Sequence, residues 1–85
     1  MIQKTLDALS DPTRREILKL LKRGEKSAGE ISERFDISAP AISRHLSLQR
    51  DAEMVSARRE GKNVYYSLSL DFIDEMKLWL NGFAE

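Results

Sequence analysis

The sequence contains no cysteine, and this absence excludes several kinds of chemistry at once. Without thiols there is no disulfide, no thiolate metal site and no cysteine nucleophile, a pattern that fits a reducing cytoplasm. The sequence also lacks an apolar run of about 18 residues, the length of a membrane span, and it lacks a signal peptide. We therefore expect a soluble, cytoplasmic protein that does not insert into a membrane.

Net charge is also missing, since 14 basic and 14 acidic side chains cancel. The high isoelectric point that is typical of nucleic-acid-binding domains is therefore absent. The charges are nevertheless unevenly distributed: residues 38–63 hold five basic and three acidic side chains, whereas residues 64–85 hold one basic and four acidic ones. The middle of the chain can thus face a polyanion, and its last segment cannot.

A large hydrophobic core is the third feature that this chain lacks. Its 85 residues are enough for a single domain over residues 1–85 and too few for two. A chain of this size buries only about 60% of its unfolded surface, and no disulfide compensates for this. We therefore expect the chain to associate with a second copy of itself.

The first part of the chain has the periodicity of short amphipathic helices. Ile2, Leu6 and Leu9 recur at spacings of four and three residues, which predicts a helix that ends near residue 10. Asp11 can accept the free N–H groups at the start of a second helix, and Gly24 ends that helix.

Two further helices are predicted on either side of a sharp turn. Ser27 and Glu30 have the spacing of a capping box, which starts the third helix. Asp36 lies in the short turn that follows, and Asp tolerates the left-handed conformation that such corners often need. Ser38 then caps a fourth helix.

After residue 52 the pattern changes from helical to alternating. Residues 54–58 and 64–68 can each form a β-strand, and Gly61 lies between them, as a tight hairpin requires. The apolar stripe of the last segment predicts a final helix that starts near residue 71. The expected fold is mainly α (α+β), with five helices and a two-stranded β-hairpin in the order ααααββα.

Two short helices joined by a sharp corner and followed by a basic hairpin define a winged helix-turn-helix. In this arrangement the helix over residues 38–52 lies in the major groove of DNA, with Ile42, Leu46 and Leu48 on its buried side. The candidate DNA contacts on this helix are Ser38, Ala39, Pro40, Ser43, Arg44, His45 and Ser47. Arg44 is the candidate for base recognition, because its guanidinium matches guanine O6 and N7, and a phosphate contact is the alternative.

Other segments offer further candidates for DNA contact. Thr13 and Arg14 lie at the start of the second helix, where free amides favour phosphate, although plain capping also explains them. His45 either donates a hydrogen bond to a phosphate or packs within the domain. The hairpin contributes Arg58, Arg59, Lys62 and Asn63. These wing side chains can follow the minor groove or the DNA backbone, or they can simply solubilise the hairpin tip.

The first and last helices carry more apolar surface than so small a domain can readily bury. We expect them to pack against their copies across a two-fold axis. The candidate interface residues are Ile2, Leu6, Leu9, Phe72, Met76, Trp79, Leu80 and Phe83. The alternative is that both helices fold back onto their own subunit.

Three segments of the chain together resemble the ArsR family of bacterial repressors: residues 10–18 (SDPTRREIL), 37–46 (ISAPAISRHL) and 59–68 (REGKNVYYSL). The resemblance spans nearly the whole chain, and within the family it points to an autorepressor subgroup that does not depend on metal. It implies a homodimer through the first and last helices, a palindromic operator, and repression by blocking polymerase. Such a protein is associated with the nucleoid when it is bound to DNA.

Departures from the family pattern bear on metal sensing and on packing. Many members sense metals through a cysteine pair at the start of the third helix, where this chain has Ser27 and Gly29. Others use His and carboxylates of the last helix, which has no His here, so we expect neither a metal nor a cofactor. Gln49 stands where the family usually has an apolar residue and Glu53 where many members have Gly, so packing at the end of the fourth helix is expected to differ.

A winged-helix protein-interaction module without DNA binding is the alternative function. Such a module would be sequestered by a membrane or signalling protein, and the neutral net charge is its main support. An enzyme is not expected, because the sequence shows no Ser/His/Asp arrangement, no glycine-rich phosphate loop and no paired His ligands.

Overall fold

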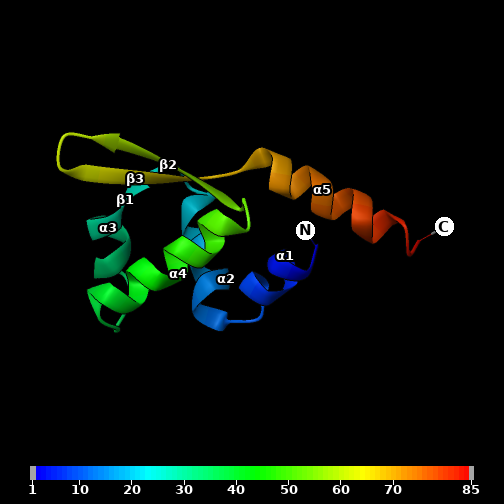
Figure 1. Ribbon diagram of the computed structural model, residues 1–85, viewed down its shortest axis with the longest axis horizontal. Coiled ribbons are helices and arrows are strands. Elements are labelled where there is room, and N and C mark those ends of the chain that lie inside the picture. The colour runs from blue at the N-terminus through cyan, green and yellow to red at the C-terminus, as the bar shows by residue number, and fades with distance from the viewer. Residues whose placement is uncertain (1, 85) are drawn as a thin grey trace.

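The computed structural model describes residues 2–84. This range forms α1 (Ile2–Leu9), α2 (Pro12–Leu21), β1 (Lys26–Ser27), α3 (Ala28–Glu33), α4 (Ala39–Asp51), β2 (Val55–Glu60), β3 (Asn63–Leu68) and α5 (Leu70–Asn81). In Figure 1 the β2–β3 hairpin extends beyond the helices at one end of the molecule, and α5 extends at the other end. This is the winged helix-turn-helix architecture, mainly helical with a β wing, that the sequence predicts.

Side-chain caps start the helices where the sequence predicts them. Asp11 and Ser38 each accept a hydrogen bond from the backbone N–H three residues further on, at 3.1 and 3.3 Å. Ser27 and Glu30 form the complete capping box, since each side chain bonds to the backbone N–H of the other residue. Because these bonds satisfy N–H groups that have no helical partner, they fix where α2, α3 and α4 begin.

The sheet has one strand more than the sequence predicts. β1 pairs with β3, with Lys26 opposite Tyr66 and Ser27 opposite Tyr65, so the strand order is β1-β3-β2. A strand of two residues is too short to show an alternating pattern, which is why the sequence does not reveal it. The extra pairing joins the start of α3 to the wing.

The left-handed backbone position among non-glycine residues lies after α4 and not in the turn before it. Asp36 has no positive φ, and among the described non-glycine residues only Glu53 does, with a φ of 58°. Glu53 follows Ala52, the C-cap of α4, which is the place where a helix commonly ends in the left-handed conformation. Many family members have a glycine at this position, and Glu53 adopts the same left-handed conformation at the cost of some backbone strain.

The core is centred on α2, α3 and α4, and a glutamine completes it. Gln49 is fully buried, whereas Leu48 is 42% exposed, so the assignment of Leu48 to the buried side of α4 is wrong. The reason is helical geometry, because a step of three residues from the buried Leu46 leads to Gln49. The side-chain nitrogen of Gln49 donates to the backbone oxygen of Arg14 at 2.8 Å, which joins α4 to α2.

Only the start of α5 rests on the core. Phe72 is buried in the core of its own subunit, and Ile73 and Met76 pack against it. Further along, the helix leaves the body of the molecule (Figure 1), and Leu78 and Phe83 are among the most exposed apolar side chains. Neither α5 nor any other helix within residues 2–84 combines the length and apolar character needed to cross a membrane.

Candidate nucleic-acid interface

The exposed face of α4 has the shape and chemistry of a helix that enters a DNA groove. Ile42 and Leu46 are each 1% exposed and hold the helix against the core. The opposite, exposed face consists of short side chains and one arginine: Ala39, Pro40, Ser43, Arg44 and Ser47. Since the major groove of B-DNA admits an α-helix, short side chains let the helix backbone approach the base edges closely.

Ser38 and Thr13, which lie at the starts of α4 and α2, differ in how available they are for contact with DNA. Ser38 is exposed, and its oxygen caps α4 by accepting a hydrogen bond, which leaves the hydroxyl hydrogen free to donate. Thr13 is half-buried in the first turn of α2, where the carboxylate of Asp11 already occupies the free N–H groups. A second anion at that position would meet like charge, so the capping alternative suits the start of α2 better than a phosphate contact.

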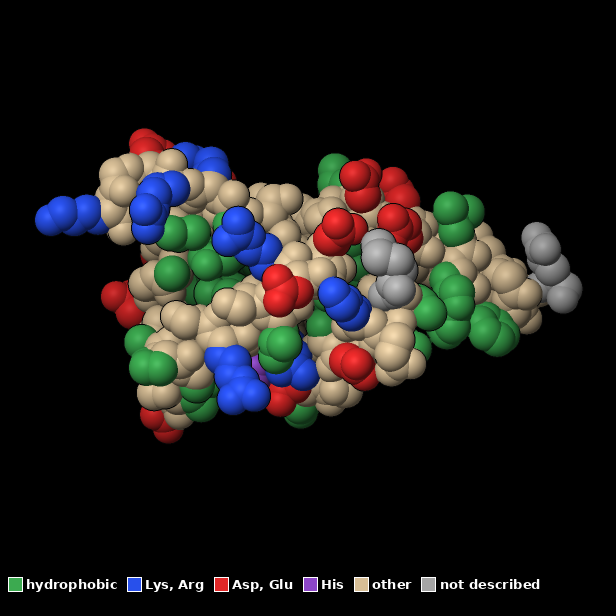
Figure 2. Space-filling model, viewed as in Figure 1, with side chains coloured by type: hydrophobic (Ala, Val, Ile, Leu, Met, Phe, Trp, Pro, Cys, Tyr) green, Lys and Arg blue, Asp and Glu red, His purple; other side chains and the backbone are tan. Residues whose placement is uncertain are grey.

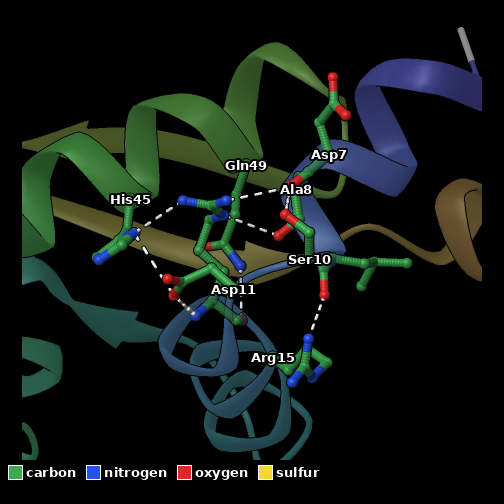
Figure 3. A network of polar contacts seen from close by, with 9 residues as sticks. Asp7, Ala8, Ser10, Asp11, Arg15, His45 and Gln49 are labelled. Atoms are coloured by element: carbon green, nitrogen blue, oxygen red, sulfur yellow. Dashed lines mark hydrogen bonds and ion pairs between the residues drawn. The ribbon is translucent and has the colours of Figure 1, made fainter.

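Arg14 points into the protein, toward α1 and α4. Its Nε donates to the backbone oxygen of Ala8 at 2.8 Å and its Nη2 to that of Asp7 at 3.1 Å. Its Nη1 lies 3.1 Å from Nδ1 of His45. Figure 3 shows these contacts between the end of α1, the start of α2 and α4. Internal acceptors occupy its guanidinium, so Arg14 is less available to DNA than its place at the start of α2 suggests.

His45 packs one edge of its ring against the domain. Its side chain is 18% exposed, and its Nδ1 lies 4.0 Å from a carboxylate oxygen of Asp11. The backbone hydrogen bond from Arg14, followed by the charges of His45 and Arg14, holds the pKa of Asp11 below its ordinary value of 3.8. The packed alternative therefore describes the Nδ1 edge of the ring, while the Nε2 edge has no partner within residues 2–84.

Arg58 fastens the wing instead of projecting from it. Its Nε and Nη2 donate to the carboxylate of Glu25 at 2.9 and 2.7 Å, and its Nη1 donates to Glu60 at 2.6 Å. The ring of Tyr65 lies 4.7 Å from the guanidinium carbon, a cation–π contact. Hydrogen bonding between the two groups raises the pKa of Arg58 and lowers that of Glu25. Arg58 is therefore less available to DNA than its place on the hairpin suggests.

The other side chains of the hairpin tip are free. Arg59, Lys62 and Asn63 are exposed, and none of their side chains forms a hydrogen bond or ion pair with another residue of the described range. Figure 2 shows Lys and Arg side chains gathered at the hairpin end, Asp and Glu side chains over the start of α5, and apolar side chains over its far end. The hairpin tip and the first turns of α4 lie toward the same end of the molecule (Figure 1), so the structure brings the basic tip and the α4 face to one end.

α1 and α5 leave apolar surface uncovered at the opposite end. The exposed members of the candidate interface are Ile2, Leu6, Trp79, Leu80 and Phe83. The rings of Trp79 and Phe83 meet edge to face, with centroids 5.0 Å apart. Leu9 and Met76 are half-buried against the core. Phe72 is 8% exposed, so its own subunit already covers most of its surface.

Sequence analysis does not identify Glu25 or Gln49 as parts of this region. Glu25 meets Arg58 across 33 positions of sequence, and Gln49 meets Arg14 across 35. Neither spacing repeats within a helix or strand, so no periodic pattern marks it. The only sign in the sequence is that Gln49 stands where the family usually has an apolar residue. This departure predicts altered packing, but it does not identify Arg14 as the hydrogen-bond partner.

Known proteins share both the sequence and the fold. A family model described as "Bacterial regulatory protein, arsR family" matches residues 11–57. The transcriptional repressor SdpR of Bacillus subtilis (strain 168) is 47% identical over 76 residues, which cover 89% of this chain and 84% of SdpR. An arsenical resistance operon repressor of Staphylococcus xylosus is 42% identical over 69 residues, which cover 81% of this chain and 66% of that protein.

Solved structures agree with these relatives. The crystal structure of a possible transcriptional regulator for arsenical resistance matches with a TM-score of 0.84 and 31% identity, covering 92% of this chain and 81% of that one. NolR from Sinorhizobium fredii matches with a TM-score of 0.77 and 32% identity, covering 96% of this chain and 82% of NolR. These relatives are transcriptional regulators and not enzymes. The family model and the identity to SdpR confirm the resemblance drawn from the sequence: the chain belongs to the arsR family of bacterial regulatory proteins.

Proposed function

We propose that this chain is a sequence-specific transcriptional repressor that binds a palindromic DNA operator as a homodimer. The observation that carries the proposal is the exposed polar face of α4. The buried Ile42 and Leu46 hold the opposite side of this helix against the core. The relatives named as repressors support repression as its outcome. In this proposal one domain, residues 1–85, carries both the DNA-binding surface and the dimer interface.

The arginines of the candidate interface divide by whether their guanidinium groups are free. Arg44 and Arg59 have no hydrogen-bond or ion-pair partner within residues 2–84, whereas Arg14 and Arg58 are bonded to neighbouring acceptors. We assign base recognition to Arg44, since a guanidinium that donates two bonds to guanine discriminates by about 1–3 kcal/mol. Its neighbours on the α4 face are Ser38, Ala39, Pro40, Ser43 and Ser47. Arg14 and Arg58 hold the elements that carry these contacts.

The wing supplies contacts that do not depend on sequence. Arg59 and Lys62 are exposed cations, and Asn63 adds an amide beside them. Phosphate contacts of this kind give affinity and fix orientation, whereas base contacts give specificity. The wing therefore adds affinity along the DNA backbone or the minor groove beside the site of α4.

The homodimer follows from the uncovered apolar surface of α1 and α5. Trp79 and Phe83 lie on the part of α5 that leaves the body of the molecule, and Ile2 and Leu6 are exposed on α1. A second copy related by a two-fold axis can cover this surface with the same surface of its own. Such a dimer presents two α4 helices to half-sites about 34 Å apart along the DNA, which is why the operator is a palindrome.

In this proposal the dimer acts on nucleoid DNA in the cytoplasm and represses by occupying a promoter and blocking polymerase. Autoregulation is the simplest use of such a protein, with an operator in the promoter of its own gene. The resemblance to an autorepressor subgroup of the ArsR family supports this part of the proposal.

Selection of bound fragments from the genomic DNA of the host, followed by footprinting and a salt titration, tests the function. We expect protection of a palindrome and a logarithm of affinity that falls steeply with the logarithm of salt concentration, because phosphate contacts release counterions. Failure to enrich any fragment would contradict the proposal. That result would favour the alternative of a protein-interaction module held by a membrane or signalling protein.

A further inference from the structure

The contact between Arg14 and His45 determines where the imidazole carries its hydrogen. Nη1 of Arg14 lies 3.1 Å from Nδ1 of His45. A guanidinium is protonated at all ordinary pH values and can only donate hydrogen bonds, so Nδ1 must accept. A neutral imidazole that accepts at Nδ1 carries its hydrogen on Nε2.

Arg14 is held firmly enough to impose this arrangement. Its other donors are bonded to the backbone oxygens of Ala8 and Asp7, so the guanidinium cannot turn away without losing those bonds. The competing group is the carboxylate of Asp11, an acceptor 4.0 Å from the same Nδ1. Within residues 2–84, Arg14 and Asp11 are the only charged side chains that form a hydrogen bond or an ion pair with the ring. The carboxylates of α3, which also packs on α4, form no ion pair with it.

The other ring nitrogen is available to a ligand. Figure 3 shows it pointing away from the polar network around Asp11. It has no partner in the described range and is not among the buried side-chain atoms that lack one, so solvent reaches it. His45 directly follows Arg44 on α4, at the edge of the proposed DNA-binding face. A phosphate of the DNA backbone is an acceptor that suits such a donor, since about half or more of protein–DNA hydrogen bonds go to phosphate and sugar.

We propose that Arg14 is a positioning residue for DNA binding, because it keeps the hydrogen of neutral His45 on Nε2, where it donates to a DNA phosphate. This inference rests on the proposed function. Without Arg14, the Asp11 carboxylate attracts a hydrogen onto Nδ1, and the neutral ring then presents a bare Nε2 to the phosphate. Only the protonated ring donates from Nε2 in that case. With Arg14 in place, the neutral ring already carries its hydrogen on the nitrogen that faces the phosphate.

The test begins with the wild-type protein, whose single histidine gives an unambiguous spectrum. A long-range proton–nitrogen correlation spectrum near pH 8 should show hydrogen on Nε2 and none on Nδ1. DNA affinity, measured at this pH on the operator duplex recovered by selection, should be retained, because the neutral ring already donates from Nε2. The Arg14→Gln variant should instead lose about tenfold in affinity at this pH and recover it as the pH falls, because a hydrogen bond to phosphate is lost and then restored.

The His45→Gln variant is the matched control, because the glutamine amide nitrogen can donate from nearly the position of Nε2 at any pH. In the double variant Arg14→Gln, His45→Gln, the pH dependence should disappear while any general weakening of the α1–α2 junction remains. Hydrogen on Nδ1 of the wild-type protein would overturn the inference. An Arg14→Gln affinity that depends on pH in the same way as that of the wild type would also overturn it. A wild-type protein that binds no DNA at all would instead contradict the proposed function itself.

Discussion

Arg58 and Glu25, 33 positions apart in the sequence, form an ion pair with two hydrogen bonds that joins β2 to the segment before β1. The pair makes one cation of the wing less available to DNA and ties the hairpin to the segment before β1. The charge that the wing offers to phosphate is therefore carried by Arg59 and Lys62, which are exposed and unpaired within residues 2–84.

Replacing Glu25 by Gln should release Arg58 toward DNA. The variant loses the acceptor charge that holds the guanidinium, so the slope of log affinity against log salt should steepen by roughly one on a random-sequence duplex. Fluorescence anisotropy over a series of salt concentrations measures this slope. The control is Glu16→Gln, which removes an equal charge from an exposed pair with Lys19 on α2. Equal slopes for the two variants would show that Arg58 stays out of reach of DNA.

Two replacements of Gln49 separate packing from hydrogen bonding in the core. Gln49→Leu keeps most of the volume and removes an oxygen that has no partner, at the cost of the bond to Arg14, so stability should change by less than about 1 kcal/mol. Gln49→Ala leaves a cavity between α4 and α2 and should cost about 2–4 kcal/mol. Urea denaturation measures both values. A loss from Gln49→Leu as large as that from Gln49→Ala would mean that the amide bond, and not the volume, holds α4 on α2.

Local features of this fold could be predicted from the sequence, because their causes lie within a few residues. The caps at Asp11, Ser27 and Ser38 depend on a side chain and a backbone N–H three positions away, and the structure contains all of them. The hairpin and the last helix also appear, since each has its own periodicity.

Features that depend on contacts between distant segments could not be predicted. β1 is a strand only because β3 lies beside it. The inward direction of Arg14 depends on Ala8 and His45 lying close together, which requires α1 and α4 to be in place. The same holds for the arginines of the candidate site. Whether a guanidinium is free or hydrogen-bonded depends on acceptors from distant parts of the chain, which the neighbouring sequence does not reveal.

The Trp79→Asp variant should be monomeric. A carboxylate in the exposed apolar surface of α5 would have to be buried unpaired in the proposed dimer, which is strongly unfavourable. Sedimentation should show half the mass, and operator affinity should fall by about a hundredfold or more, because one half-site is bound without its neighbour. Lys77→Asp, on the other side of the same helix, is the control and should stay dimeric. A Trp79→Asp dimer would remove α5 from the interface.

The cap of α2 should give the protein a small acid-sensitive contribution to stability. The pKa of Asp11 is lowered below 3.8 in the folded protein, so the stabilisation is complete above that value and is lost as the pH falls through the folded pKa. Asp11→Asn keeps a good N-cap without the charge. The difference in thermal midpoint between wild type and variant should therefore be present above about pH 4 and shrink below it. A difference that persists unchanged in acid would mean that the charge contributes nothing.

Base recognition by α4 through Arg44 is tested most directly by the ratio of operator affinity to random-duplex affinity. We predict that Arg44→Ala abolishes this preference, with a loss of roughly tenfold or more on the operator. Affinity for the random duplex should change only slightly, and the dimer should remain intact. The control Arg23→Ala, at an exposed position after α2, should leave the ratio unchanged. An unaltered ratio for Arg44→Ala would contradict the account.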